Sequence, residues 1–105
     1  MSLHRRTVQR DLNEGPIVEM LRAAGCSVQR LSIAGAPDLL CGIRGVTFLV
    51  EVKNPDRDGK QRRLRENQAD WARKWKGSHV WVVESVEEVG PLLSRVTEGR
   101  WRDAP

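Results

Sequence analysis

The sequence predicts an α/β domain in which a mixed β-sheet is flanked by helices. Short apolar runs rich in β-branched residues alternate with amphipathic segments at helical spacing, and a tight hairpin connection joins two of the runs. A longer helical segment separates the last apolar run from the three before it, as in a crossover connection. The expected order is therefore helix, three strands, helix, strand and helix.

The length of 105 residues suits one domain, and we expect a single domain over residues 1–105. Residues 1–10 are basic and polar, which predicts a loose arm. Residues 97–105 show no periodicity, which predicts an irregular tail.

The fold is expected to be organised around a strand at residues 46–53. Side chains alternate faces along a strand, so one face of this segment is wholly apolar, while the other begins apolar and ends in Glu51 and Lys53. Two largely apolar faces indicate an interior strand. Charges at the end of such a strand are costly unless they are paired or used. The end of this strand is therefore a candidate for a functional site.

The remaining elements follow from periodicity and from start and stop signals. We expect helices at 14–24, 65–76 and 86–95, and strands at 26–32, 38–43 and 79–83. Asn13 is a candidate cap for the first helix, and Ser85 with Glu88 has the pattern of a capping box. Arg44-Gly45 predicts a tight hairpin turn, and residues 54–59 predict an exposed loop.

Charge is mildly positive overall and unevenly distributed. The formal net charge is +4, from 18 Lys and Arg against 14 Asp and Glu. Basic residues cluster in the arm, around residues 60–65 and around residues 73–76. Such patches suit a polyanion such as nucleic acid, although solvated faces of ordinary helices explain a single cluster equally well.

The cysteines and the apolar stretches indicate a cytoplasmic protein. Cys26 and Cys41 have no metal-like spacing and are expected to be reduced core thiols. No apolar run follows the basic start as it would in a signal peptide, and no apolar stretch is long enough to cross a membrane.

A third charged residue is expected to join Glu51 and Lys53. In a hairpin about Arg44-Gly45, residues equidistant from the turn face each other, which places Asp38 near Glu51. Two adjacent carboxylates repel unless a cation lies between them, and such oxygen ligands suit Mg²⁺ or Mn²⁺. The alternative is a structural ion pair of Lys53 with one of the carboxylates.

The helix predicted at residues 65–76 has one polar residue, Gln68, on its apolar face. Either this amide contributes to a site or it is satisfied by backbone groups. Trp71 and Trp75 share the face, and Trp81 lies in the last strand. We expect all three tryptophans to be core residues and not base-stacking platforms.

These motifs carry a family resemblance. Pro37-Asp38 followed by Glu51-Val52-Lys53 is the P-D…(D/E)-x-K pattern of the restriction-endonuclease-like nucleases. With the flanking runs at 35–40, 48–53 and 66–71, the chain resembles the VRR-Nuc group over about residues 11–90. That group includes small stand-alone phage and prophage nucleases related to archaeal Holliday-junction resolvases.

The resemblance implies roles at the matching positions. Asp38 and Glu51 would be metal ligands together with the backbone carbonyl of Val52. Lys53 would be the catalytic lysine, and Gln68 would orient the site or a water.

The resemblance also implies an acidic residue on the first helix that completes the metal site. Glu14 is the candidate here, although Gly15-Pro16 interrupts the usual pattern after it. Asn13 could share the role, and Glu19 is a weaker candidate. The alternative is that Glu14 is a carboxylate stabilised by the positive end of the helix dipole.

The implied function is divalent-metal-dependent cleavage of DNA, with branched or structured DNA as substrate and a homodimer as the working form, in a bacterial or phage-infected cell. Trp101 and the last helix are possible interface elements. Basic residues after the central strand are expected to contact phosphates, with a solvated loop as the alternative: Arg57, Lys60, Arg62 and Arg63. Two other classes stay open: a non-catalytic DNA-binding module with the nuclease fold, and a metal-free protein with a structural ion pair.

Overall fold

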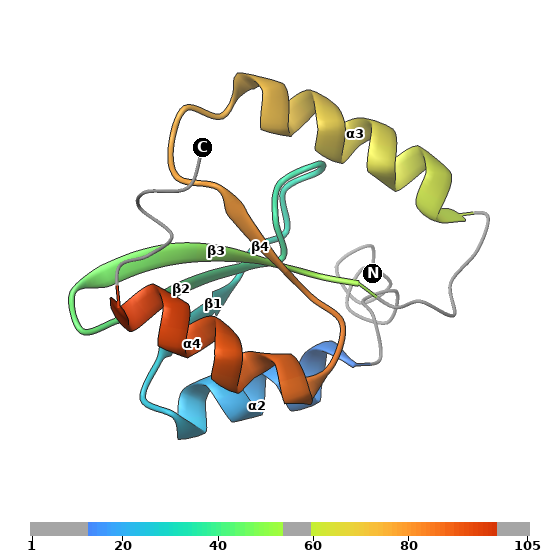
Figure 1. Cartoon of the computed structure of the whole chain (residues 1–105). Helices are drawn as coiled ribbons and strands as arrows, with labels where there is room; N and C mark the ends of the chain where they lie inside the picture. Colours follow the sequence, from blue (N-terminus) through green and yellow to red (C-terminus); the bar gives the residue numbers. More distant parts are fainter. Residues whose placement is uncertain (1–12, 54–59, 99–105) are drawn as a thin grey trace.

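The computed structural model describes residues 13–53 and 60–98, with side chains from residue 67 onward in the second segment. Its elements are α2 (Glu14–Ala23), β1 (Ser27–Arg30), β2 (Leu39–Ile43), β3 (Val46–Val52), α3 (Lys60–Lys74), β4 (Val80–Val83), the short 3₁₀ helix η1 (Val86–Glu88) and α4 (Val89–Glu98). The predicted order and the predicted α/β class are both confirmed (Figure 1).

The sheet has four strands in the order β1-β2-β3-β4. The first two pairings are antiparallel, and β3 pairs with β4 in parallel, so the sheet is mixed and β3 is interior as expected. Leu39 faces Val50 and Ile43 faces Val46, which is the register predicted for the hairpin. Arg44 and Gly45 take φ values of 51° and 79° at its turn, as a two-residue hairpin of the favoured twist requires.

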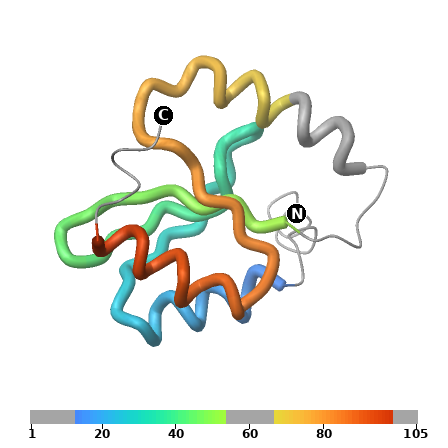
Figure 2. Tube along the Cα trace, viewed as in Figure 1, coloured from blue at the N-terminus to red at the C-terminus, as the bar shows by residue number. Residues whose placement is uncertain are grey.

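The main core lies between the sheet and the helix pair α2 and α4, which run side by side on one face (Figure 2). The apolar face of β3 packs there, with Phe48 and Val50 fully buried. Ile17 and Leu21 from α2 and Val96 from α4 meet that face. Helix α3 lies on the other side of the sheet (Figure 1). Its described side chains contribute nothing to the buried core cluster.

Several predicted boundaries are wrong by a few residues. Helix α3 begins at Lys60 and not at Arg65, and it ends at Lys74. Helix α4 runs to Glu98 and so includes the start of the predicted irregular tail. Its buried stripe continues to Val96, which packs the last turn against the core. The predicted arm, the loop at 54–59 and Trp101 lie outside the described residues.

The prediction that three tryptophans are core residues is correct only for Trp81. Trp81 is 9% exposed and belongs to the core cluster, whereas Trp75 is 44% exposed and Trp71 is half-buried. Their face of α3 is apolar, but the described residues cover that face only partly. Periodicity identifies an apolar face and does not say how deeply the face is covered.

The cysteine prediction is confirmed in structure, since Cys26 and Cys41 are buried and unbridged. Burial, followed by the neighbouring Cys26, raises the pKa of the Cys41 thiol to about 12. Among the described helices, none combines the length and the apolar composition that crossing a membrane requires.

Candidate active site

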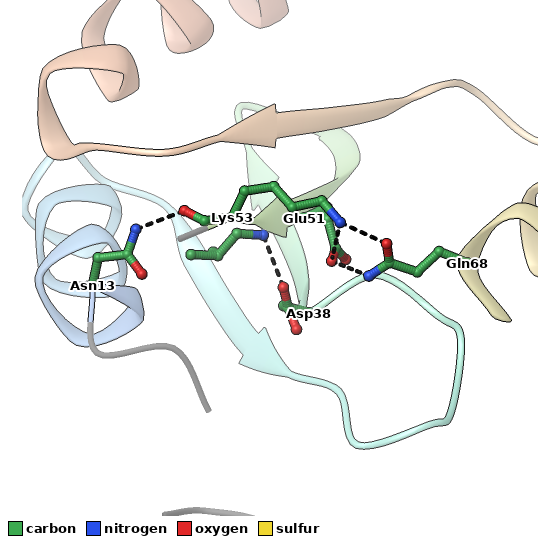
Figure 3. A network of polar contacts seen from close by, with 6 residues as sticks. Asn13, Asp38, Glu51, Lys53 and Gln68 are labelled. Atoms are coloured by element: carbon green, nitrogen blue, oxygen red, sulfur yellow. Dashed lines mark hydrogen bonds and ion pairs between the residues drawn. The ribbon is translucent and has the colours of Figure 1, made fainter. Parts of the chain in front are cut away.

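Four predicted site residues converge at the end of β3, on the side of the sheet that faces α3 (Figure 3). They are Asp38, Glu51, Lys53 and Gln68, which we call the carboxylate–lysine cluster. The segment before β2, the end of β3 and helix α3 each contribute to it. Residues thirty positions apart in the sequence are therefore brought together by the hairpin and by the crossover helix.

Asp38 is placed by backbone hydrogen bonds on both of its sides. It precedes β2 by one residue, and the observed hairpin register continues to place it beside Glu51. Its Oδ2 accepts the backbone N–H of Val52 at 2.8 Å, and its carbonyl oxygen accepts the N–H of Leu31 at 2.8 Å. The carboxylate is thus fixed against the strand that carries Glu51.

Gln68 links Glu51, near the end of β3, to Lys53, which directly follows the strand. Its Oε1 accepts a hydrogen bond from Lys53 Nζ at 2.6 Å, and its Nε2 donates to Glu51 Oε2. Lys53 Nζ also lies 3.5 Å from the same carboxylate oxygen of Glu51. The polar residue on the apolar helix face therefore contacts side chains of the cluster, and the alternative of an amide satisfied by backbone groups does not apply.

The ionised form of Glu51 is disfavoured by its surroundings in the cluster. Glu51 is only 8% exposed, and burial followed by the charge of Asp38 raises the pKa of its carboxyl to about 7. Lys53 and Gln68 act in the opposite direction by favouring the ionised form. Burial and repulsion outweigh these two contacts, so a further positive charge would stabilise the carboxylate pair.

Asn13 binds the backbone of Lys53, and it does not act as the helix cap that the sequence predicted. Its position precedes α2, but its side chain makes no capping hydrogen bond. Nδ2 instead donates to the carbonyl of Lys53 at 2.9 Å (Figure 3). It also donates to the carbonyl of Glu84 at 2.8 Å, so Asn13 ties the start of α2 to the ends of β3 and β4. Oδ1 is buried and finds no hydrogen-bond partner in the described part of the chain.

Glu14 is buried, and its contact lies on the opposite side of the sheet from the cluster. Its Oε2 accepts from Arg30 Nε at 2.8 Å, and Glu14 is 3% exposed. Arg30 pairs with Leu39, and so shares the face that packs on α2, whereas Glu51 projects toward the other face. Glu19, the weaker candidate, is exposed on α2.

The donor set fits a hard divalent cation. Within residues 13–53 and 60–98, no group of three or more His, Cys, Asp or Glu side chains is placed to hold a metal, so Glu14 does not form a third carboxylate beside Asp38 and Glu51. Mg²⁺ needs no such group, because it commonly binds through one or two carboxylates and completes its shell with waters and substrate phosphates. Two adjacent carboxylates, one with a raised pKa, provide oxygen ligands and a deficit of positive charge.

The four residues predicted to contact phosphates have no described side chains. Lys60, Arg62 and Arg63 lie in the first turns of α3, on the same helix as Gln68, and their side chains are outside the described set. Arg57 lies in the undescribed segment before α3.

Sequence reasoning missed a close approach that positions Gln68. Gly35 has a φ of +82°, and a Cβ built on it would lie 2.8 Å from the backbone oxygen of Asn67. The loop that leads to Asp38 thus touches the helix one residue before Gln68. The glycine was visible in the sequence, but its partner was not, because the contact joins segments more than thirty residues apart.

A four-stranded mixed sheet with this cluster defines a nuclease-type α/β domain, consistent with a restriction-endonuclease-like fold. A scan with protein-family models and a search of curated proteins each found no match. A search of solved structures found one described as "VRR_NUC domain", with 33% sequence identity and a TM-score of 0.52. The similarity covers 80% of this chain and 97% of that structure. At this identity and coverage, the chain belongs to the VRR-Nuc family of nuclease domains.

Proposed function

We propose that this protein is a divalent-metal-dependent endonuclease that hydrolyses phosphodiester bonds in DNA. One observation carries the proposal: Asp38 lies beside Glu51 while Gln68 joins Glu51 to Lys53. Membership of a nuclease-domain family supports DNA as the partner. A structural ion pair alone would leave Asp38 and Gln68 without a reason to converge on the same carboxylate.

Mg²⁺ or Mn²⁺ would be held by Asp38 and Glu51, with the Val52 carbonyl as the further ligand that the family resemblance implies. When bound, the cation supplies Lewis acidity toward a phosphate oxygen and lowers the pKa of a water.

The chain's own residues position the reactants. Gln68 holds Lys53 Nζ next to Glu51, where the ammonium can orient the attacking water or neutralise charge that develops on the phosphate. Gln68 fixes the side chains of Lys53 and Glu51 relative to each other. Because these groups are already positioned, less conformational entropy is lost on reaching the transition state.

Branched or structured DNA is the proposed substrate. A homodimer is the proposed working form, since paired cuts across a junction need two sites related by symmetry. Both points rest on family analogy.

The competing function is that of a DNA-binding module that keeps the nuclease fold and does not cleave. The ion pair between Glu14 and Arg30 favours it, because the acidic residue expected to complete the metal site is engaged elsewhere.

A cleavage assay separates the classes. Labelled four-way junction, flap and linear duplex are incubated with Mg²⁺, with Mn²⁺ or with chelator, beside Lys53→Ala and Asp38→Ala. We expect metal-dependent cutting by the wild type and a loss of about 100-fold or more in each variant. Junction binding without cutting by the wild type supports the competing function. Cleavage that neither substitution affects refutes the site.

A further inference from the structure

A concave feature lies along α3, near the carboxylate–lysine cluster. It is a pocket of about 400 Å³. Six residues line it: Ala34, Asn67, Asp70, Trp71, Lys74 and Trp75. We call it the tryptophan pocket. None of its lining residues belongs to the cluster, and the chemistry proposed above does not use it.

Two stacked indoles form the apolar wall of the pocket. The rings of Trp71 and Trp75 lie 4.8 Å apart between centroids with an interplanar angle of 17°. Trp75 is nevertheless 44% exposed, which leaves a large aromatic surface in solvent. Aromatic side chains usually bury such area, so an exposed stacked pair indicates a surface that another flat group can cover.

The Trp75 ring is held in one orientation. Its Nε1 donates to the Ser78 carbonyl at 2.9 Å. The ring also lies directly against Gly77, where an added Cβ would meet indole atoms at 2.6 to 2.8 Å. A rigid exposed ring loses little conformational freedom on binding, as an effective stacking surface requires.

The polar lining of the pocket selects a class of occupant. Asn67 contributes an amide that can both donate and accept, and Lys74 contributes a cation. Asp70 is already engaged by Arg73 at 2.6 Å and by Lys74 at 3.3 Å, so its charge is largely compensated. A flat group with hydrogen-bonding edges that is attached to an anion matches this lining. A nucleobase with its phosphate has these properties.

The pocket lies on the same helix that carries Gln68 of the cluster. Gln68 contacts Glu51 and Lys53, while Trp71 and Trp75 follow it on the same face of the helix and its C-terminal extension. The separation along the axis from Gln68 to Trp75 is about 10 Å. The sequence of α3 is strongly basic, with six Lys and Arg against two acidic residues, which favours a polyanion along it.

We propose that the tryptophan pocket receives an unpaired nucleobase of the DNA strand held at the carboxylate–lysine cluster, stacked on Trp75. This inference rests on the proposed function and makes it more specific. A base inside a duplex is stacked on both sides and must leave the stack to enter, whereas a base in a tail, flap or junction opening enters at lower cost. The pocket therefore makes the enzyme prefer DNA that has unpaired bases.

Equilibrium binding in chelator tests the pocket without cleavage. Fluorescence anisotropy compares a labelled blunt duplex with the same duplex bearing a short unpaired tail. The wild type binds the tailed DNA more tightly. Trp75→Ala reduces that affinity about fivefold to 100-fold, the range expected for one base–aromatic stack, and leaves the affinity for blunt duplex unchanged.

Three more variants separate loss of the Trp75 ring from general effects on folding or binding. Trp75→Phe retains most of the preference, because a ring remains. Gly77→Ala weakens it, because the added methyl displaces the Trp75 ring while leaving both indoles in the chain. Met20→Ala is the matched control: Met20 is equally exposed at 44% but lies on α2, across the sheet from the pocket, and its loss has no effect on binding.

The outcomes distinguish the pocket from the proposed function. If the wild type binds both DNAs equally, or if Trp75→Ala keeps the preference, the pocket assignment is overturned and the nuclease proposal stands. If the wild type binds neither DNA, the pocket assignment is overturned, and the cleavage assay described above decides the proposed function separately.

Discussion

Glu51 is the residue at which burial and charge conflict most directly. It is nearly buried, it lies beside Asp38, and its carboxyl has a pKa of about 7, well above its ordinary value of 4.5. Because the folded-state pKa is raised, this group destabilises the metal-free fold progressively as the pH rises from about 4.5 to about 7. A bound cation would reverse the effect by favouring the ionised form.

The first prediction concerns this carboxyl. Mn²⁺ must displace the proton of Glu51, so affinity for Mn²⁺ should fall as the pH drops below about 7, by up to about tenfold per pH unit, and should level off above it. Titration calorimetry at about pH 6 and about pH 8 measures the difference. Equal affinity at the two values would show that Glu51 is not a ligand.

Asn13 gives a second prediction at the residue scale. Asn13→Ala removes the donor for the carbonyls of Lys53 and Glu84 and should lower the free energy of unfolding by about 1–3 kcal/mol. Thr97→Ala is the control, since its exposed hydroxyl bonds only carbonyls of its own helix and should matter by less than about 0.5 kcal/mol. Urea denaturation compares them, and equal losses would contradict the bridging role.

At the scale of elements, the hairpin was the most predictable part of the fold. Arg44-Gly45 fixes the register, and the register alone places Asp38 beside Glu51. The position of Gln68 was predictable only as a face of a helix. Its contacts depend on how closely α3 approaches the sheet, and that distance is set at Gly35 by a contact that the sequence does not reveal.

A third prediction tests this approach. Gly35→Ala must relieve a 2.8 Å contact with Asn67 at a φ of +82°, so α3 should move away from the cluster. We expect a loss of about 1–3 kcal/mol in stability and a fall in cleavage rate. Gly90→Ala is the control: a Cβ there meets nothing within 4 Å, and in helix α4 it should be neutral or stabilising by up to about 1 kcal/mol. Thermal melts and rates measured on both variants decide, and normal activity in Gly35→Ala would refute the positioning argument.

For the molecule as a whole, the two faces of the sheet differ in composition and in proposed role. The side covered by α2 and α4 holds the apolar core, and the side facing α3 holds the cluster and the tryptophan pocket. Sequence patterns predicted the first side well, because the apolar face of β3 follows strand periodicity and the buried stripe of α2 follows helix periodicity. They misjudged Trp71 and Trp75, because an apolar stripe looks the same whether a full layer or a partial one covers it.

The place of Glu14 was beyond sequence reasoning for a related reason. A carboxylate at the start of α2 can point along several directions, and only the pairing of β1 with β2 brings Arg30 to it. The carboxylates that the hairpin aligns were predictable, and the one that depends on packing between separate layers was not.

The central claim is that the carboxylate–lysine cluster hydrolyses DNA with a divalent cation. The most direct measurement is the single-turnover rate of Mn²⁺-dependent cleavage of one labelled four-way junction by the wild type and by Glu51→Gln. The substitution preserves shape and removes a buried carboxylate that is repelled by Asp38, so the variant should fold at least as well as the wild type. We predict cleavage by the wild type and a rate lower by about 100-fold or more in the folded variant. Equal rates in the two proteins would contradict the claim.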